Sequence, residues 1–264
     1  MAKLKKEFDK FYYYENSVQN AGNEVDFMQA EFVKLRKKKA KVLREDFCGT
    51  ALISYHWVKQ HKLNKAYAVD LDFSPIKYGQ INHGAKLKES SHRLNYLNDN
   101  VLTVKTEAPD ILCAFNFSYF IFKERSILLN YFKKVKNDLA GNGVFFLDLF
   151  GGPESQVENV DVLKFPMFQY FWECKSFNPI NQHCEFAIHF KLKNQKKRKD
   201  VFTYDWRLWT FPELADLLME AGFAQVINYW EGDDLKKKTG NGIFTPTKKA
   251  ENCPAWVGYI VALK

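Results

Sequence analysis

The chain has 264 residues, a formal net charge of +8 and 46% hydrophobic residues. This length can bury a full hydrophobic core and lies near the upper size of one domain, so we expect a single domain over 1–264. No apolar run approaches the roughly 20 residues that span a bilayer, which argues against a membrane protein. The five cysteines include no C-x-x-C pair, which argues against a metal site or a disulfide framework. With no recognisable signal peptide, we expect a cytoplasmic protein.

The positive charge would attract anionic partners such as nucleic acid. The lysines are scattered, however, with local runs only at 34–39, 196–199 and 236–238. None of these runs is regularly interleaved with aromatic residues, as a surface that binds nucleic acid would be. A solvated basic surface is therefore favoured, and nucleic-acid binding stays open as an alternative.

The first half of the chain begins with a helix and then alternates strands and helices. The helix is predicted from apolar residues at three- and four-residue spacing, namely Val25, Met28, Phe32 and Leu35. Strands are predicted at 42–46, 66–71, 110–115 and 143–150, and helices at 50–61, from 74 onward and at 124–139. This order indicates a parallel sheet with helices on both faces.

Capping residues mark several helix ends. Ser74 is expected to cap the helix that begins there, and Gly141 to close the helix at 124–139 in a left-handed conformation. Thr210 opens a later helix with Glu213 placed for a capping box. Gly222 is expected to end that helix.

The region 151–208 breaks the alternation. Strands are predicted at 168–174, 184–192 and 201–208, with hairpin turns at 177–181 and 193–199. The last two strands are predicted at 223–230 and 255–263, joined by a charged, Gly-containing loop. The expected fold is therefore α/β, a doubly wound and mostly parallel seven-stranded sheet with an antiparallel last strand. A small antiparallel β platform is inserted after the fifth parallel strand.

A turn of small residues follows the first predicted strand, in R-E-D-F-C-G-T-A at 44–51. Open α/β sheets bind ligands at the carboxyl ends of their strands, where the first turn meets a helix. Small residues let the backbone approach such a ligand closely. The turn lacks the full G-x-G-x-x-G of dinucleotide-binding folds, which argues against NAD.

An acidic pair ends the second predicted strand, in A-V-D-L-D at 68–72. An acid at this place can accept both ribose hydroxyls of an adenosine, and Asp70 is the candidate. The alternative is that Asp70 and Asp72 cap the helix that begins near Pro75. The spacing from the first turn favours the ribose interpretation.

Four segments now suggest a family: E-D-F-C-G-T-A, A-V-D-L-D, D-I-L-C-A-F-N-F-S-Y and W-T-F-P-E-L-A-D-L-L-M-E-A-G-F. In this order they resemble the class I, Rossmann-like S-adenosylmethionine-dependent methyltransferases, over nearly the whole chain from about Phe8 to Lys264. More narrowly, they resemble a branch that carries an R-E-D-F-C-G-T turn and an N-F-S-Y segment. The resemblance implies S-adenosylmethionine as cofactor, S-adenosylhomocysteine as product, and no metal. It carries almost no information about the methyl acceptor.

The resemblance implies how the turn would hold the methionine end of the cofactor. Glu45 takes the place of the acid that commonly reaches the methionine amino group, and Asp46 could share that role. Phe47 and Ala51 stand where the family usually has glycines, so the backbone path of this turn departs from the common pattern.

The resemblance also places the rest of the cofactor. Asp70 matches the ribose acid, Asp99 or Asn100 would meet the adenine amine, and Asn116 and Phe117 would lie beside the transferred methyl. The cofactor-binding residues are expected to be Glu45, Asp46, Phe47, Cys48, Gly49, Thr50, Asp70, Leu71, Asp99, Asn100, Val101, Asn116 and Phe117.

The chain is divided by expected role within the one domain. Residues 1–40 form an N-terminal helical lid, in which Tyr14, Val18 and Gln19 would cover the cofactor. Residues 41–150 form the cofactor-binding half, 151–208 the inserted substrate platform, and 209–264 the C-terminal helix and strands.

Three side chains are candidates for a catalytic role, although methyl transfer needs a general base only if the acceptor must lose a proton. His189 could be that base or a structural residue of the platform. Arg207 could anchor a substrate carboxylate or phosphate, or pair with Asp205 or Glu213. Tyr119 lies in the N-F-S-Y segment.

The acceptor side stays open. N-F-S-Y at 116–119 resembles the N-P-P-Y of amino-group methyltransferases, but both prolines are missing, and Tyr119 could instead wall the cofactor pocket. Trp172 and Trp209 could line an acceptor pocket or pack the platform.

A small-molecule acceptor is favoured, because the inserted strands would roof a closed pocket. The alternatives are a nucleic-acid or protein methyltransferase, a protein that binds S-adenosylmethionine without catalysis, and another S-adenosylmethionine reaction. A nucleic-acid enzyme would need the lysines of 34–41 and 193–199 on the cofactor face.

Overall fold

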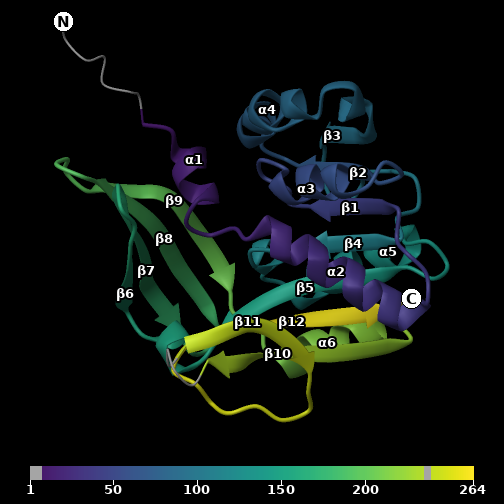
Figure 1. Ribbon diagram of the computed structural model, residues 1–264. Coiled ribbons are helices and arrows are strands. Elements are labelled where there is room, and N and C mark those ends of the chain that lie inside the picture. Colours follow the sequence, from purple (N-terminus) through teal and green to yellow (C-terminus); the bar gives the residue numbers. More distant parts are fainter. Residues whose placement is uncertain (1–7, 235–238) are drawn as a thin grey trace, which may run out of the picture.

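The computed structural model describes residues 8–234 and 239–264. Its centre is an eight-stranded sheet in the order β11-β10-β12-β5-β4-β1-β2-β3 (Figure 1). The strands are β1 (Val42–Asp46), β2 (Lys65–Asp70), β3 (Leu94–Asn98), β4 (Ile111–Ala114), β5 (Val144–Gly151), β10 (Gln225–Asp234), β11 (Thr239–Pro246) and β12 (Trp256–Leu263). The strands β1 to β5 pair in parallel, whereas β12 runs antiparallel to both β5 and β10. This confirms the predicted doubly wound sheet with an antiparallel last strand.

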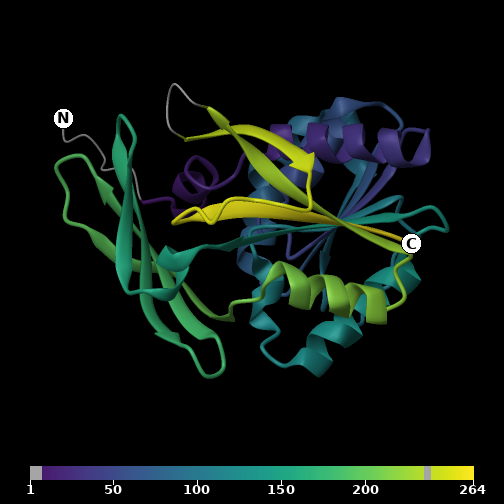
Figure 2. The ribbon, with the colours of Figure 1, turned by 90° about the horizontal axis from the view of Figure 1, so that it is seen from below.

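Helices cover both faces of this sheet (Figures 1 and 2). One face carries α2 (Ala21–Arg36), α3 (Leu52–Gln60) and α4 (Phe73–Asn82), and the other carries α5 (Arg125–Asp138) and α6 (Phe211–Glu220). Shorter helices are α1 (Lys10–Glu15), η1 (Gly84–Arg93), η2 (Ser118–Ile121) and η3 (Pro153–Gln156). Because side chains alternate along a strand, neighbouring residues of β5 enter different cores: Phe145 packs with α5 and α6, and Phe146 with α2 and α3.

The inserted segment forms a separate antiparallel sheet beside the carboxyl end of β5 (Figure 2). Its strands are β6 (Asn159–Lys164), β7 (Phe168–Asn178), β8 (His183–Leu192) and β9 (Arg198–Arg207). We call this sheet the platform. One of its faces is aromatic and the other is largely polar, because Trp172, Phe186 and Tyr204 alternate with polar neighbours such as Glu173 and Asp205.

Three strands were not predicted by range, namely β3, β6 and β11, and β11 makes the main sheet eight-stranded where seven strands were expected. β3 is an edge strand of that sheet, and only its first residue, Leu94, is buried. β11 lies in the stretch predicted as a charged loop, where β10 continues to Asp234 and pairs with it. The Glu231 carboxylate accepts a 2.7 Å hydrogen bond from the Gly242 N–H across this hairpin. β6 is the edge strand of the platform, and its side chains are mostly exposed. Among the residues whose burial is described, neither β6 nor β11 has a buried side chain, so neither shows the alternation on which the prediction depended.

Helix caps were predicted with mixed success. The capping box of Thr210 and Glu213 is confirmed. Gly222 follows the end of α6 as predicted, in a left-handed conformation. Ser74 is not a cap: Asp72 is the N-cap of α4, and its carboxylate accepts the Ser74 N–H. Gly141 is not left-handed either, because α5 already ends at Leu139 in an extended conformation.

Within the described residues, no helix is both long enough and apolar enough to cross a membrane.

Candidate functional site

The turn after β1 takes a tight path with three left-handed residues. Phe47, Gly49 and Ala51 have φ values of 57°, 54° and 59°. Such values cost a non-glycine residue energy, which accounts for the glycines that the resemblance leads one to expect at Phe47 and Ala51. The Cys48 N–H donates to the Val69 carbonyl at 2.9 Å and thereby holds the turn against the end of β2.

Asp70 fastens this turn from the neighbouring strand. Its carboxylate accepts the Gly49 N–H at 2.7 Å and the Asp72 N–H at 2.9 Å. Partial burial raises the pKa of Asp70, and the two N–H donors oppose that rise. The helix-capping role that was open for both acids therefore falls to Asp72 alone. A carboxylate has about four acceptor positions, so Asp70 retains capacity to accept further donors.

Glu45 and Asp46 lie behind the turn, on opposite faces of the sheet. The Glu45 carboxylate accepts the Ser54 N–H at 2.9 Å and the Ser54 hydroxyl at 2.5 Å, and burial raises its pKa to about 7. The Asp46 carboxylate is bound instead by Arg44 at 2.7 Å and by the Tyr131 hydroxyl at 2.9 Å. The residues that line the cavities at this end of the sheet include neither acid.

Arg44, the first residue of the R-E-D sequence, has a structural role. It is fully buried, and it also donates to the Asp138 carboxylate of α5 at 2.5 Å. Because alternate residues of β1 share a face, Arg44 and Asp46 point together toward α5, and Glu45 points toward α3. The motif is thus a buried ion cluster that fixes the base of the turn.

A second group of predicted residues lies beside Asp70 at the ends of β2 and β3. Leu71 is 73% exposed, and Asp99 and Asn100 are also exposed. The Asp99 N–H donates to the Asp70 carbonyl at 3.1 Å, which holds the two loops together. Val101 is buried, and its carbonyl accepts a hydrogen bond from Arg44 at 3.4 Å.

The turn opens onto a cavity of about 310 Å³, which we call the turn cavity. Of the predicted residues it is lined by Phe47, Cys48, Gly49, Thr50, Asp70 and Asn116. The N-terminal segment contributes Lys10, Phe11, Tyr14 and Gln19, and the platform contributes Phe202, Tyr204 and Trp206. A Cβ built at Gly49 would meet nothing within 4 Å, so the backbone here faces open space.

Glu15 binds the N-terminal segment to this turn, a contact that the sequence did not reveal. Its carboxylate accepts the Thr50 hydroxyl at 2.5 Å and lies 2.7 Å from His83 Nε2. Thr50 directly follows Gly49, so a single side chain of α1 joins the segment to the turn and to the end of α4.

The loop after β4 is held in an unusual conformation. Asn116 and Phe117 both have a φ of 58°, which is uncommon for non-glycine residues and is found at functional sites. The Asp148 carboxylate of β5 accepts both of their N–H groups, at 2.8 and 2.9 Å. Burial raises the pKa of Asp148 to about 7, and the two N–H donors counter it.

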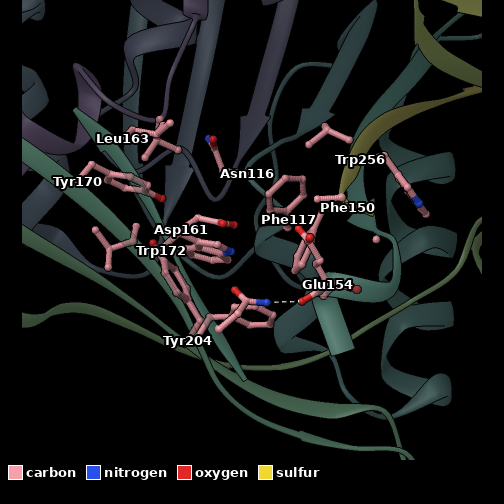
Figure 3. Close-up of a pocket in the computed structure, with 18 of the residues that line it drawn as sticks. Asn116, Phe117, Phe150, Glu154, Asp161, Leu163, Tyr170, Trp172, Tyr204 and Trp256 are labelled. Carbon is pink, nitrogen blue, oxygen red and sulfur yellow. Dashed lines mark hydrogen bonds between the residues drawn. The ribbon is translucent and has the colours of Figure 1, made fainter. Parts of the chain in front are cut away.

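A larger cavity of about 550 Å³ lies between the aromatic face of the platform and the main sheet, and we call it the platform cavity (Figure 3). Its walls include Phe117, Phe150, Tyr170, Trp172, Phe186 and Trp256. It shares Tyr14, Asn116, Tyr204 and Trp206 with the turn cavity. Both volumes are in the range of small-molecule sites, so two ligand-sized cavities adjoin at Asn116.

Comparisons with known proteins give matches at the level of structure only. No family model and no curated protein matches the sequence. A S-adenosylmethionine-dependent methyltransferase from Clostridium acetobutylicum matches with a TM-score of 0.69 at 15% identity, covering 96% of this chain and 97% of that one. An amino pentose methyltransferase from Micromonospora echinaspora has a TM-score of 0.67 at 12% identity, with 97% of each chain covered. A sugar N-methyltransferase from Streptoalloteichus has a TM-score of 0.64 at 14% identity, covering 97% of this chain and 93% of that one.

The chain has the S-adenosylmethionine-dependent methyltransferase fold. The coverage shows that this fold includes the platform as well as the main sheet, so the inserted strands are part of the shared architecture.

None of the three catalytic candidates lines either cavity of this methyltransferase fold. Tyr119 is fully buried, and its hydroxyl donates to the Asp148 carbonyl at 2.6 Å. Arg207 donates to Glu213 at 3.0 Å and stacks on Trp209, 3.8 Å from the ring centre. The structure therefore favours the ion-pair alternative for Arg207. Trp209 is buried and lines neither cavity, which favours the packing alternative for that residue.

His189 lies on the polar face of the platform, away from the platform cavity. Its Nε2 donates to the Glu173 carboxylate at 2.6 Å, and its Nδ1 accepts the Asp200 N–H at 2.8 Å. Glu173, His189 and Asp200 form a group with the spacing of metal ligands. Because both ring nitrogens already have partners, we treat His189 as a structural residue, neither a base nor a ligand.

The two basic runs within the described residues do not flank the turn cavity or the platform cavity. The run at 34–41 lies at the amino ends of the parallel strands, where the Lys41 N–H binds Asp110 at 2.8 Å. In the run at 193–199, Lys197 lies 4.0 Å over the ring of Phe171, on the other face of the platform. The third run, 236–238, lies outside the described residues. This placement does not meet the requirement for a nucleic-acid enzyme.

Proposed function

We propose that the protein transfers the methyl group of S-adenosylmethionine to a small molecule. The observation that carries this proposal is the pair of adjoining cavities. One is formed by the turn at which this fold binds adenosine ligands, and the other is roofed by the platform. Their shared wall at Asn116 would bring a cofactor and an acceptor into contact.

The residues of the turn cavity fit the proposed cofactor. Asp70 has acceptor capacity for ribose hydroxyls. Leu71, which follows Asp70 outside the lining of the cavity, is exposed and would offer an apolar surface for adenine. The buried Gln19 Oε1 lines this cavity and has no hydrogen-bond partner within the described residues. The ammonium of the methionine end would supply the donor that this atom lacks.

Acidic groups near the turn suit a cofactor with positive charge. The buried Glu24 Oε2 also has no partner within the described residues. Burial, with the nearby Asp148 and Glu45 carboxylates, raises the pKa of Glu24 to about 8. These three acids would favour a cation in this part of the molecule, because a cation offsets their mutual repulsion.

When bound, the cofactor supplies a methyl group that its sulfonium already activates. The protein would hold the acceptor close to this methyl group and would exclude water from the site. Asn116 and Phe117, fixed by Asp148, would border the transfer path. Tyr14, Tyr204 and Trp206 line both cavities and would cover that path.

Calorimetric titration of the full chain with S-adenosylmethionine, S-adenosylhomocysteine and NADH tests the proposal. We expect micromolar binding of the first two and none of NADH. No binding of either sulfur compound would contradict the proposed function. Release of S-adenosylhomocysteine would then be followed with small acceptors and with nucleic acid in parallel.

A further inference from the structure

The platform cavity differs in charge from the molecule as a whole. The chain carries a net charge of +8, yet the described residues that line the cavity include three acids and no Lys, Arg or His. The acids are Glu154, Asp161 and Glu231. A ligand with a carboxylate or phosphate would find no basic side chain in this lining. It would be repelled by the three acids, which carry the same sign of charge.

Asp161 is placed against an aromatic ring by the pairing of β6 with β7. It lies directly opposite Trp172 in the antiparallel register, so both side chains are on the same face of the platform (Figure 3). Within the described residues, the Asp161 carboxylate has neither a hydrogen bond nor an ion pair, and the same holds for the Glu154 carboxylate. Both charges are therefore free to face a ligand.

The aromatic wall beside Asp161 is continuous. Trp172 stacks on Phe186 with ring centres 4.8 Å apart, and Tyr204 and Trp206 are 4.3 Å apart. Aromatic faces attract cations that lie within about 6 Å of the ring centre. Within the described residues, no Lys or Arg lies over the rings of Trp172, Tyr204 or Trp206, so these rings are available to a cation from outside.

We propose that the acceptor is a small amine with an apolar body, which binds in the platform cavity as its ammonium form and is methylated on nitrogen. This inference rests on the proposed methyltransferase function and specifies its substrate class. The ammonium first gives up one proton to solvent at the open rim of the cavity. The nitrogen lone pair then forms the N–C bond, while the S–C bond breaks and sulfur keeps its electron pair. The products are a methylammonium and a neutral thioether.

Three probes of similar size and different charge test the inference: benzyltrimethylammonium, benzyl alcohol and benzoate. Each is titrated into the full chain saturated with S-adenosylhomocysteine, and tryptophan fluorescence reports binding because Trp172 and Trp206 line the cavity. We expect the cation to bind at least about tenfold more tightly than the alcohol, and benzoate to bind most weakly. Equal binding of the cation and the alcohol, or preference for benzoate, would overturn the inference.

A matched pair of variants locates the effect. Asp161→Asn removes a charge from the cavity side of the platform, and we expect it to weaken binding of the cation about fivefold without changing that of benzyl alcohol. Glu185→Gln removes the same charge from an exposed position on β8, and we expect no change. An equal loss in both variants would mean a general field effect, which contradicts a specific site.

Activity distinguishes this inference from the function on which it rests. We expect release of S-adenosylhomocysteine with benzylamine and not with benzyl alcohol. If S-adenosylmethionine binds by calorimetry but the alcohol is the better acceptor, only the amine assignment fails. If S-adenosylmethionine does not bind at all, the proposed function fails, and the same probe titrations on the full chain without S-adenosylhomocysteine still report the charge preference of the cavity.

Discussion

The carboxylate of Asp148 accepts the backbone N–H of Asn116 at 2.8 Å, although 32 positions separate the two residues in the chain. The same carboxylate accepts the Phe117 N–H at 2.9 Å. Two consecutive left-handed residues are strained, and these hydrogen bonds offset that strain. Asp148 thus determines the shape of the loop at which the two cavities meet.

Replacing Asp148 should therefore destabilise the protein and disturb the junction. Asp148→Asn keeps the size of the side chain but places an amide donor against an N–H group. We expect the free energy of unfolding to fall by about 1–3 kcal/mol, the usual cost of leaving a buried polar group unpaired. Urea denaturation measures this change. Asp205→Asn, which breaks only an exposed pair with Lys123, should change stability by less than about 1 kcal/mol. Equal effects of the two substitutions would count against the assignment.

Asp70 is expected to bind the ribose of the cofactor, and a second acid provides a matched control. We expect Asp70→Ala to weaken S-adenosylmethionine binding by about 1–3 kcal/mol, or roughly 5- to 150-fold, because it leaves the ribose hydroxyls unpaired. Asp110 also accepts two backbone N–H groups, from Lys41 and Val42, but it lies at the amino ends of the parallel strands, away from the turn cavity. Asp110→Ala should lower stability without changing affinity in calorimetry. Unchanged affinity in a folded Asp70→Ala protein would remove the ribose assignment.

The sequence predicted the parts of this molecule that depend on local pattern. The apolar runs at 66–71 and 143–150 are β2 and β5, because a buried parallel strand shows a continuous apolar stretch whatever its partners are. The acid at the end of β2 was likewise visible, because its place follows from the order of strands in this kind of sheet.

The features that were missed depend on contacts between residues far apart in the chain, or on which face of a strand a side chain points to. Glu15 meets Thr50 only after folding, and no local pattern records that contact. His189 was a candidate base or a structural residue, and the structure favours the second, because Ile188 faces the platform cavity and its neighbour must face the other way. The sequence already indicated this orientation, because the apolar Phe186 and Ile188 share one face of the strand and therefore place His189 on the other.

Glu15 should control how firmly the N-terminal segment covers the turn. Glu15→Gln keeps the shape but removes the charge that the Thr50 hydroxyl and His83 face. We expect faster proteolytic cleavage near α1 and weaker binding of S-adenosylmethionine, by about three- to tenfold, since charged hydrogen bonds contribute roughly 1.5–3 kcal/mol and the amide retains part of that. Asp26→Asn, an exposed change on α2, is the control and should match the parent chain. Cleavage rates that do not differ between the two variants would show that the contact is not what holds the segment.

Glu45 predicts how stability depends on pH. Burial raises its pKa from 4.5 to about 7 in the folded protein, so between these values the folded state keeps a proton that the unfolded state releases. Stability from this group is therefore full below about pH 4.5, falls as the pH rises toward 7, and is constant above that. The loss should reach up to about 3 kcal/mol, at 1.36 kcal/mol for each pKa unit.

Glu45→Gln does not titrate, and its amide can still accept the Ser54 hydrogen bonds. Urea denaturation at pH 5 and pH 8 should thus show the parent chain losing stability relative to Glu45→Gln as the pH rises. A stability difference that stays constant with pH would mean that Glu45 is ionised in the folded protein, held so by the N–H and hydroxyl of Ser54.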